Sequence, residues 1–289
     1  MTSKRRHSDS THAIRPTAQS AIHVAAHSPG PTAVRVVKLG GRAQGDPTLP
    51  TRIHDAVAVT GARLVVVHGG GDEVSALQRQ MGTEPTFVGG RRVTSPSDLD
   101  AVRMVLSGAV NKRLVAQFIT AGVRAVGLSG EDGGLITARV TNPAFGRVGG
   151  DVITDATLVA DLLNSGWVPV ISPLARDREA ANGAGLNVNG DDAAASIAAA
   201  LGADELVFVA DVPGVFEDGT VLRGIDTAAI AALVARGVVQ GGMRAKLEAA
   251  TMALRNGVRR VRVAGLAGIT DHSAGTVISL TTTNSREHA

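Results

Sequence analysis

Short runs of valine, isoleucine and leucine alternate along the chain with longer amphipathic stretches. Short β-branched runs without polar alternation are typical of buried parallel strands, because both faces of such strands are covered. The runs of this kind are 34–39, 63–68, 123–129, 168–173, 205–210 and 259–264. Apolar residues at helical spacing predict helices between these runs, at 52–60, 73–81, 97–121, 156–165, 192–202, 227–236 and 243–256.

The alternation predicts an α/β protein, built as a three-layer α/β/α sandwich around an open and mainly parallel sheet. Two glycine-bearing stretches, 85–94 and 135–152, predict β-hairpins appended to that sheet. The predicted helix at 97–121 starts with Ser95 as its cap and Pro96 in its first turn. Ligands of open sheets bind beyond the carboxyl ends of the strands, so the residues after each strand are the candidates for chemistry.

Residues 1–33 do not follow this pattern. They mix Ser, Thr, His, Pro and Arg without sustained periodicity, which predicts a disordered or arm-like tail. The alternatives for this segment are a short arm helix around 18–26 and an Arg-rich, acid-poor targeting peptide. The remaining residues, 34–289, are expected to form the folded domain.

The charge balance argues against a nucleic-acid partner. The chain has 29 basic and 26 acidic residues, of which the predicted tail holds four and one, so the folded part carries 25 of each. Aromatic residues, which stack on bases in many such proteins, make up only 2% of the chain. We therefore expect no nucleic-acid partner.

Hydropathy and cysteine content further restrict the class of protein to which the chain can belong. No apolar run approaches the ~18 residues of a membrane span, so no membrane association is expected. The absence of cysteine excludes disulfides and thiolate metal sites, and it fits a cytoplasmic protein.

The first predicted strand ends in Lys38, and Gly40 and Gly41 follow. A lysine beside backbone N–H groups that no side chain obstructs suits a phosphate. A tight strand–helix turn with an exposed lysine would have the same sequence, so this motif alone leaves both interpretations open.

The second predicted strand ends in His68, followed by Gly69, Gly70 and Gly71 at the start of a helix. Amides at a helix N-terminus converge on anions, and a plain loop is the alternative. We expect His68 to pack or to form hydrogen bonds rather than to act as a base. The sequence contains no GxxxxGK[ST] motif and no GxGxxG after the first strand, which excludes a P-loop protein and argues against a Rossmann dehydrogenase.

Three later segments carry further polar candidates. Arg91 and Arg92 lie near a predicted hairpin end, where one of them could clamp a carboxylate and the other remain solvated. Asn187 precedes a helix start at which Asp191 either caps the helix or holds a lysine in place. Lys246 lies in the first turns of another predicted helix, from which it could reach a phosphate.

Taken in order, these segments resemble the amino acid kinase family, over roughly residues 34–280. The matching motifs are VVKLGG (36–41), VVVHGGG (65–71), GGRRVT (89–94), GLSGEDGG (127–134), NVNGD (187–191), VADVPGVFED (209–218) and GGMRAKLEAA (241–250). The third and fifth motifs favour the branch that acts on acylated glutamate. Each motif is short, but their common order along the predicted α/β pattern makes the resemblance specific.

The resemblance implies an eight-stranded, mainly parallel sandwich. It implies an N-terminal lobe (about 34–180) that binds the acylated amino acid and dimerises, and a C-terminal lobe (about 181–289) that binds ATP. By motif position, Lys38 and Lys246 look like the catalytic lysines and Asp191 like the aspartate that orients them. The other implied site residues are Gly40, Gly41, Gly69 and Gly70 for phosphate, Gly69, Gly70, Arg92 and Asn187 for the substrate, and Asp211, Gly214, Val215 and Gly242 for the nucleotide.

The activity that the resemblance implies is phosphorylation of the side-chain carboxylate of N-acetylglutamate by ATP and Mg²⁺, in arginine biosynthesis, by a homodimer or higher oligomer. A carboxylate with a pKa near ~4 is ionised at neutral pH, so the reaction needs alignment and charge neutralisation rather than a base. The alternatives are a kinase for N-succinylglutamate or an aminoadipate derivative, and a non-catalytic protein that senses nucleotides or amino acids.

Three residues and one segment depart from the family pattern. Gly190 lies where the family commonly has alanine, and Glu131 lies where many relatives carry lysine. Arginine-inhibited members typically have a tyrosine at the position of Leu39 and a His–Ser–Leu–Leu-type segment where this chain reads ITDHSAGT (269–276). We therefore expect no feedback inhibition by arginine.

Overall fold

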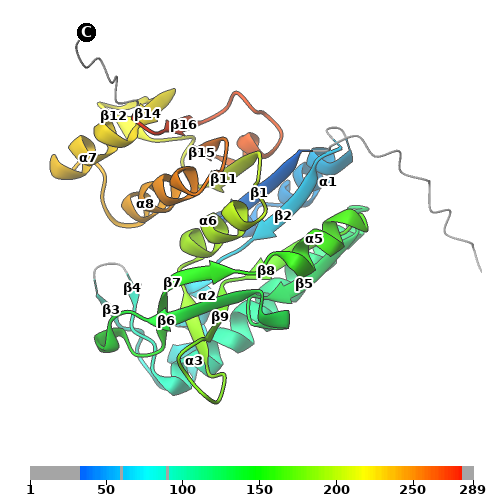
Figure 1. Cartoon of the computed structure of the whole chain (residues 1–289), viewed down its shortest axis with the longest axis vertical. Helices are drawn as coiled ribbons and strands as arrows, with labels where there is room; N and C mark the ends of the chain where they lie inside the picture. Colours follow the sequence, from blue (N-terminus) through cyan, green and yellow to red (C-terminus); the bar gives the residue numbers. More distant parts are fainter. Residues whose placement is uncertain (1–32, 59–60, 89–90, 282–289) are drawn as a thin grey trace, which may run out of the picture. The chain divides into compact units, whose positions relative to one another are not determined.

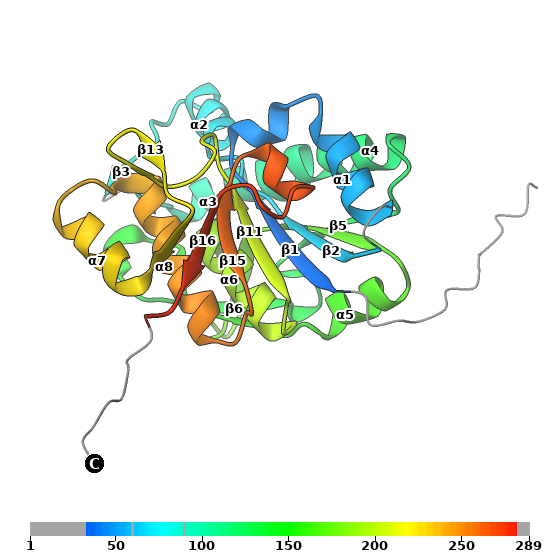
Figure 2. The same cartoon turned by 90° about the horizontal axis from the view of Figure 1, so that it is seen from above.

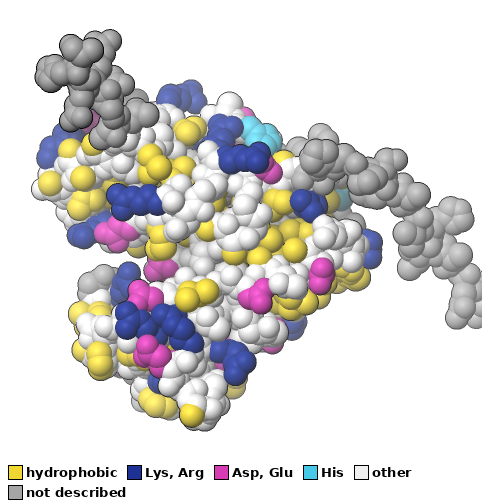
Figure 3. All heavy atoms as spheres, viewed as in Figure 1, with side chains coloured by type: hydrophobic (Ala, Val, Ile, Leu, Met, Phe, Trp, Pro, Cys, Tyr) yellow, Lys and Arg dark blue, Asp and Glu magenta, His cyan; other side chains and the backbone are white. Residues whose placement is uncertain are grey.

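The computed structural model describes residues 33–58, 61–88 and 91–281, which lie in one compact unit. The tail predicted at 1–33 lies outside the described residues, apart from Ala33. Among the residues that are described, no helix is both long and apolar enough to span a membrane. On the face shown in Figure 3, basic and acidic side chains are interspersed, in line with the even charge balance of residues 34–289.

An eight-stranded sheet forms the centre of the fold, in the strand order β14-β16-β15-β11-β1-β2-β8-β5 (Figures 1 and 2). Neighbouring strands are parallel, except for the antiparallel pair β15–β16. The predicted runs became β1 (Val34–Leu39), β2 (Arg63–Val67), β5 (Ala125–Ser129), β8 (Val168–Ser172), β11 (Glu205–Val209) and β15 (Val261–Ala264). The sequence patterns missed the edge strands β14 (Gly224–Asp226) and β16 (Thr276–Ser279), which are too short to show a period.

Helices cover both faces of this sheet, which confirms the three-layer sandwich. Val36 and Val37 of β1 lie in separate apolar clusters, because successive strand side chains point to opposite faces. Figure 2 shows α1 and α4 on one side of the sheet and α5 and α6 on the other. The helices are α1 (Leu49–Ala58), α2 (Gly71–Gln80), α3 (Pro96–Arg103), α4 (Asn111–Thr120), α5 (Thr157–Asn164), α6 (Gly190–Ala200), α7 (Thr227–Ala235) and α8 (Gly241–Arg255).

The long helix predicted at 97–121 starts as expected but is not uniform. Ser95 and Asp98 form a reciprocal capping box, and Pro96 is the first helical residue. A π-helical segment, Met104–Val110, then separates α3 from α4. Such widened turns occur frequently at functional sites, and this one packs beside the glycine-rich turn described below.

The second predicted hairpin forms, but its place in the fold was predicted wrongly. β6 (Ile136–Val140) and β7 (Val148–Thr154) pair antiparallel, yet they close a separate four-stranded ring with β9 (Leu174–Asp177) and β10 (Gly185–Val188). The ring forms because β10 pairs with both β7 and β9. The first hairpin consists of β3 (Phe87–Val88) and β4 (Arg91–Arg92), and an unpredicted one of β12 (Phe216–Glu217) and β13 (Thr220–Val221).

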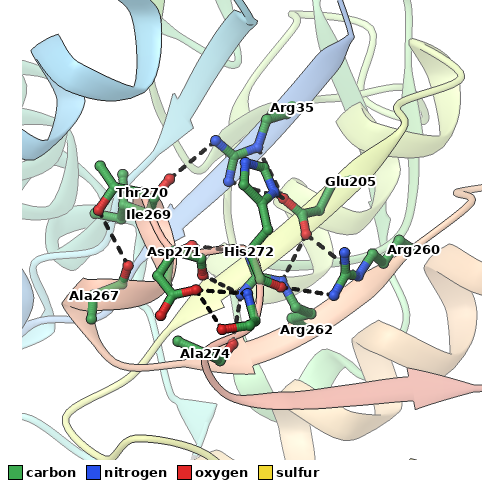
Figure 4. Close-up of polar contacts among 12 residues, drawn as sticks. Arg35, Glu205, Arg260, Arg262, Ala267, Ile269, Thr270, Asp271, His272 and Ala274 are labelled. Atoms are coloured by element: carbon green, nitrogen blue, oxygen red, sulfur yellow. Dashed lines mark hydrogen bonds and ion pairs between the residues drawn. The ribbon is translucent and has the colours of Figure 1, made fainter. Parts of the chain in front are cut away.

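A buried ionic cluster joins the neighbouring strands β1, β11 and β15 (Figure 4). The carboxylate of Glu205 accepts hydrogen bonds from Arg35 Nε at 2.9 Å and Arg262 Nε at 2.7 Å. Both guanidinium groups also donate to backbone carbonyl oxygens within residues 268–274. The cluster therefore fixes the loop between β15 and β16 against the sheet.

Candidate active site

The candidate site lies at the carboxyl end of β1, in the middle of the sheet. Lys38 is the fifth of the six residues of β1, flanked in register by Val67 of β2 and Phe208 of β11. The turns after β1 and β2 and the first turn of α6 meet at this edge, since a Cβ on Gly190 would lie 3.2 Å from Lys38 Cε and 3.6 Å from the carbonyl oxygen of His68. The position agrees with the rule that open sheets bind ligands beyond the carboxyl ends of their strands.

Three predicted residues form one charged centre. Lys38 Nζ lies 2.8 Å from Asp191 Oδ1, and Lys246 Nζ lies 3.2 Å from Asp191 Oδ2. The three side chains are only 9%, 14% and 6% exposed, in the order Lys38, Lys246, Asp191. One carboxylate therefore orients two ammonium groups, and the centre keeps a net positive charge that suits phosphate oxygens.

Burial and pairing act in opposite directions on the pKa values of this centre. Burial lowers the pKa of Lys38, and the nearby Asp191 only partly offsets this effect. Burial by itself would raise the pKa of Asp191, but the two lysines outweigh it and hold that pKa below its usual range. Asp191 is therefore ionised at neutral pH.

The start of α6 fixes the position of Asp191. The side-chain oxygen of Asn189, the N-cap, accepts hydrogen bonds from the backbone N–H groups of Asp191 and Asp192. The carboxylate of Asp191 thus lies in the first turn, where the helix dipole favours negative charge. Gly190 lies beside it without a side chain, and an alanine there would crowd Lys38 at 3.2 Å.

The two glycine turns play different parts. The N–H of Gly40 donates to Val209 O at 3.0 Å, and a Cβ on Gly40 would approach that oxygen to 2.9 Å. Gly40 therefore joins β1 to β11, and its amide is already occupied. The N–H groups of Gly41, Gly69 and Gly70 have no hydrogen-bond partner among the described residues, so they are the amides open to an anion.

A buried polar chain that the sequence analysis missed supports the second turn. Asn111 Nδ2 lies 3.1 Å from His68 Nε2, and His68 Nδ1 lies 2.8 Å from Gly69 O. Asn111 also donates to Val170 O, and the asparagine and the histidine are both fully buried. Burial lowers the pKa of His68 to about 4, so the ring is neutral and serves as a bridge, as expected. The sequence did contain a signal for this buried polar chain, because Asn111 lies on the apolar face of a predicted helix.

The π-helical segment packs directly on this turn. Gly70 has φ +150°, which favours glycine, and a Cβ there would meet Leu106 Cδ2 at 2.7 Å and Val110 Cγ2 at 3.1 Å. Gly70 is therefore required for its conformation and for the close approach of the segment.

A cavity of about 210 Å³ opens beside the charged centre. Its walls include all four residues predicted to bind the substrate: Gly69, Gly70, Arg92 and Asn187. Gly190 also lines the cavity, and it connects the cavity to Lys38. The structure thus brings the predicted substrate residues together at one place, although they come from three separate segments.

The two polar side chains of that set are held by neighbours. Arg92 donates to Gly71 O and Ser75 Oγ, both at 2.7 Å, and to the side chain of Gln78. Its guanidinium carbon lies 4.7 Å from the centre of the Phe87 ring. Asn187 Nδ2 donates to Thr94 Oγ1 at 3.1 Å.

The residues predicted to bind the nucleotide are not gathered at one place, unlike those predicted to bind the substrate. Asp211 follows β11 and forms an exposed ion pair with Arg42 at 3.6 Å, and Gly242 is exposed at the start of α8. A Cβ on Gly214 would lie 2.7 Å from Thr276 Oγ1. Val215 is fully buried and donates its N–H to the same oxygen. Val215 therefore packs in the core, and a bound nucleotide would meet the loop rather than this side chain.

A mainly parallel sheet in an α/β fold, with two lysines and open glycine amides beside its carboxyl edge, defines a class of protein that handles phosphate groups. The family model described as the amino acid kinase family matches residues 33–265, and the chain belongs to this family.

Comparisons with individual proteins agree with this family assignment. The acetylglutamate kinase of Chloroflexus aurantiacus is 43% identical over 248 residues, covering 85% of this chain and 96% of the relative. Among solved structures, smu.665 of Streptococcus mutans has a TM-score of 0.76 at 28% identity, over 85% of this chain and 98% of the other. A carbamate kinase from Giardia lamblia bound to AMP-PNP has a TM-score of 0.66 at 18% identity, over 87% and 99% of the two chains, which shows the fold alone.

Proposed function

We propose that this chain transfers the γ-phosphoryl group of ATP to the side-chain carboxylate of N-acetylglutamate, which yields the acyl phosphate and ADP. The observation that carries the proposal is the pairing of Lys38 and Lys246 on Asp191, next to a cavity lined by Arg92 and Asn187. The relatives named acetylglutamate kinase support the same substrate. The reaction belongs to arginine biosynthesis.

In the proposed reaction a carboxylate oxygen of the substrate forms a bond to the γ-phosphorus, and the bond from that phosphorus to the β,γ-bridging oxygen breaks. The substrate is already ionised, so the obstacle is repulsion between the carboxylate and the phosphates. Lys38 and Lys246 reduce this repulsion and stabilise the charge on the transferred group. Asp191 acts through them as a positioning residue, and no general base is required.

The remaining predicted residues take supporting roles in this proposal. The free amides of Gly41, Gly69 and Gly70 bind phosphate or carboxylate oxygens, while Gly40 keeps the first turn close to β11. The loop with Asp211 and Gly214, and Gly242 at the start of α8, bind the nucleotide, with residues 34–180 supplying most of the acyl-amino-acid side and 181–289 the ATP side.

Mg²⁺ is proposed to enter with ATP. Within the described ranges no three His, Asp or Glu side chains gather so as to hold a metal ion, and the carboxylate of Asp191 is committed to the two lysines. The chain's own residues therefore do not form a complete Mg²⁺ site, and phosphate oxygens would have to supply the ligands. When bound, the ion adds positive charge to the phosphates. A homodimer or higher oligomer, a cytoplasmic location and insensitivity to arginine stay predictions.

The test is acyl-phosphate formation trapped with hydroxylamine, in the presence of ATP and Mg²⁺. The panel contains N-acetylglutamate, N-succinylglutamate, N-acetylaminoadipate, glutamate and aspartate, and the control is Lys246→Ala. We expect a strong preference for N-acetylglutamate and loss of the product in the variant. Preference for another acylated substrate would move the pathway but keep the mechanism. The protein must be shown to be folded and to bind ATP. If such protein phosphorylates no carboxylate, the proposal of a kinase fails, and the alternative of a non-catalytic sensing protein takes its place.

A further inference from the structure

All three carbonyl oxygens of the glycine turn after β2 are engaged by the protein. Their partners are His68 Nδ1 for Gly69, the N–H of Val74 for Gly70, and Ser75 Oγ for Gly71, at 2.8, 3.0 and 2.9 Å. The N–H groups of Gly69 and Gly70, in contrast, have no hydrogen-bond partner in the described part of the chain. The turn therefore directs its acceptors into the protein and leaves its donors free.

The contact with His68 determines the direction of one of these free donors. In a trans peptide the C=O and N–H bonds point in opposite directions, so an anchored carbonyl oxygen also orients the N–H group of the same peptide. The carbonyl group of Gly69 and the N–H of Gly70 belong to one peptide. Because His68 holds that carbonyl oxygen, the N–H of Gly70 points away from the buried ring. Gly70 lines the substrate cavity, whereas His68 lies behind it in the core.

The hydrogen bonds around His68 define which ring nitrogen carries the proton. Nδ1 faces Gly69 O, which can only accept, and Nε2 faces the amide nitrogen of Asn111, which can only donate. The orientation of that amide follows from its other contacts, Nδ2 with Val170 O at 2.8 Å and Oδ1 with Lys112 Nζ at 3.2 Å. Burial lowers the pKa of His68 to about 4, so the ring is neutral. Its single proton therefore lies on Nδ1 and is donated to Gly69 O.

The turn after β1 contains the same arrangement. Gln44 Nε2 donates to Gly40 O at 3.3 Å, and the peptide that contains this carbonyl group supplies the free N–H of Gly41. Gln44 and His68 are both buried, with 4% and 0% of their surface exposed. In each turn a buried polar side chain thus holds the carbonyl oxygen behind a free amide.

We infer that His68 is a positioning residue, which holds the peptide between Gly69 and Gly70 so that the N–H of Gly70 binds the carboxylate that receives the phosphoryl group. Asn111 fixes the ring and its tautomer. The inference rests on the proposed function. An amide that is oriented in advance needs no reorganisation when the reactants meet, and it keeps the carboxylate aligned with the γ-phosphorus. Loss of this orientation should slow the transfer without weakening the binding of ATP.

The test compares two amide side chains of different length at position 68. The amide nitrogen of asparagine is as many bonds from Cβ as Nδ1 is, so His68→Asn keeps a donor for Gly69 O but does not reach Asn111. The amide of glutamine lies as many bonds from Cβ as Nε2 does, so His68→Gln contacts Asn111 and leaves Gly69 O without its donor.

We expect kcat with N-acetylglutamate to fall about 10- to 100-fold in His68→Gln, as for a misaligned reacting group. His68→Asn should retain most of the wild-type kcat, and the Kd for ATP should be unchanged in both variants. If the ring only supports Asn111 and the core, His68→Gln should be the more active variant, and that order would overturn the inference. Equal losses in the two variants, or no loss in either, would also overturn it.

The ¹⁵N NMR signals of the ring give a second measurement. In the wild type at pH 7, Nδ1 of His68 should carry the proton and Nε2 should not. Asn111→Leu removes the donor that faces Nε2, so both tautomers should appear and kcat should fall by less than in His68→Gln. A proton on Nε2 in the wild type would contradict the proposed orientation of Gly69 O.

The matched control for stability is Phe118→Leu. Phe118 is fully buried further along the same helix as Asn111 and does not line the cavity. This variant should be less stable but keep the wild-type kcat, whereas a loss as large as that of His68→Gln would make destabilisation alone a sufficient explanation and overturn the inference. If the wild type forms no acyl phosphate from N-acetylglutamate, the proposed function fails, while the ring tautomer is still measured, so the two failures are distinguishable.

Discussion

Lys38 Nζ lies 2.8 Å from Asp191 Oδ1, and this contact joins the central strand β1 to the first turn of α6. The same carboxylate contacts Lys246 at the start of α8. One buried acid thus sets the distance between two cations that belong to different elements. Removing the charge of Asp191 should therefore affect Lys38 and Lys246 at once, whereas a substitution of either lysine changes only one of the two cations.

Asp191→Asn is expected to lower kcat by roughly 10²- to 10³-fold, the scale seen when a positioned charge-stabilising group is lost. Because Asp191 raises the pKa of Lys38 against the effect of burial, its loss should let Lys38 deprotonate at a lower pH. The alkaline limb of the kcat profile should therefore shift to lower pH, which steady-state rates across pH would measure. Asp192→Asn is the control, because that carboxylate has no ion pair with either lysine. Unshifted limbs in both variants would contradict the expectation.

His68 should make the folded state sensitive to mild acid. Its pKa is lowered from 6.5 to about 4, so between these values the unfolded chain binds a proton that the folded chain does not. Stability should therefore fall as pH decreases from 6.5 towards 4, by about 3 kcal/mol from this group alone. The measurement is the free energy of unfolding against pH, compared between the wild type and His68→Gln.

In His68→Gln this part of the pH dependence should disappear, although the variant is less stable at pH 7. The matched control is His54→Gln, since that ring is 45% exposed. If the wild-type curve and the His68→Gln curve run parallel between pH 6.5 and 5, the buried neutral ring does not control stability there.

Glu205→Gln is expected to destabilise the protein by about 3–5 kcal/mol, because the buried guanidinium groups of Arg35 and Arg262 would lose their counter-charge. Burial would raise the pKa of Glu205, but those arginines outweigh it and lower that pKa below the ordinary 4.5. Its contribution is therefore fully present above pH ~4.5 and is lost as the pH falls through the lowered value.

Denaturant unfolding at pH 7 measures this effect. Glu73→Gln is the control, because Glu73 and Arg113 form an exposed pair that should contribute no more than about 1 kcal/mol. Equal effects of the two substitutions would refute the view that the Glu205 cluster fixes the loop between β15 and β16.

Much of the fold follows from local patterns in the sequence. The β-branched runs predicted six strands of the main sheet, and the Ser95–Pro96 signal predicted the start of α3. The glycine turns after β1 and β2 indicated which edge of the sheet is functional. This signal consists of glycine and lysine residues that are neighbours in the sequence, so it can be recognised without the tertiary structure. The family resemblance then identified Lys38, Asp191 and Lys246, which the structure brings together.

Other features depend on residues far apart in the sequence, and only the tertiary structure decided them. The strands β14 and β16 are too short to show a period, and they exist because β16 pairs with β15 and β14 pairs with β16. β6 and β7 lie outside the main sheet because they form a closed ring with β9 and β10.

The same holds for the polar groups at the site. Gly40 and Gly41 look alike in the sequence, yet only Gly40 gives its amide to β11. Arg91 and Arg92 are identical neighbours, yet α2 engages one and leaves the other open. The sequence determines which groups are available, whereas a hydrogen bond depends on where a distant partner lies, and only the packed chain fixes that position.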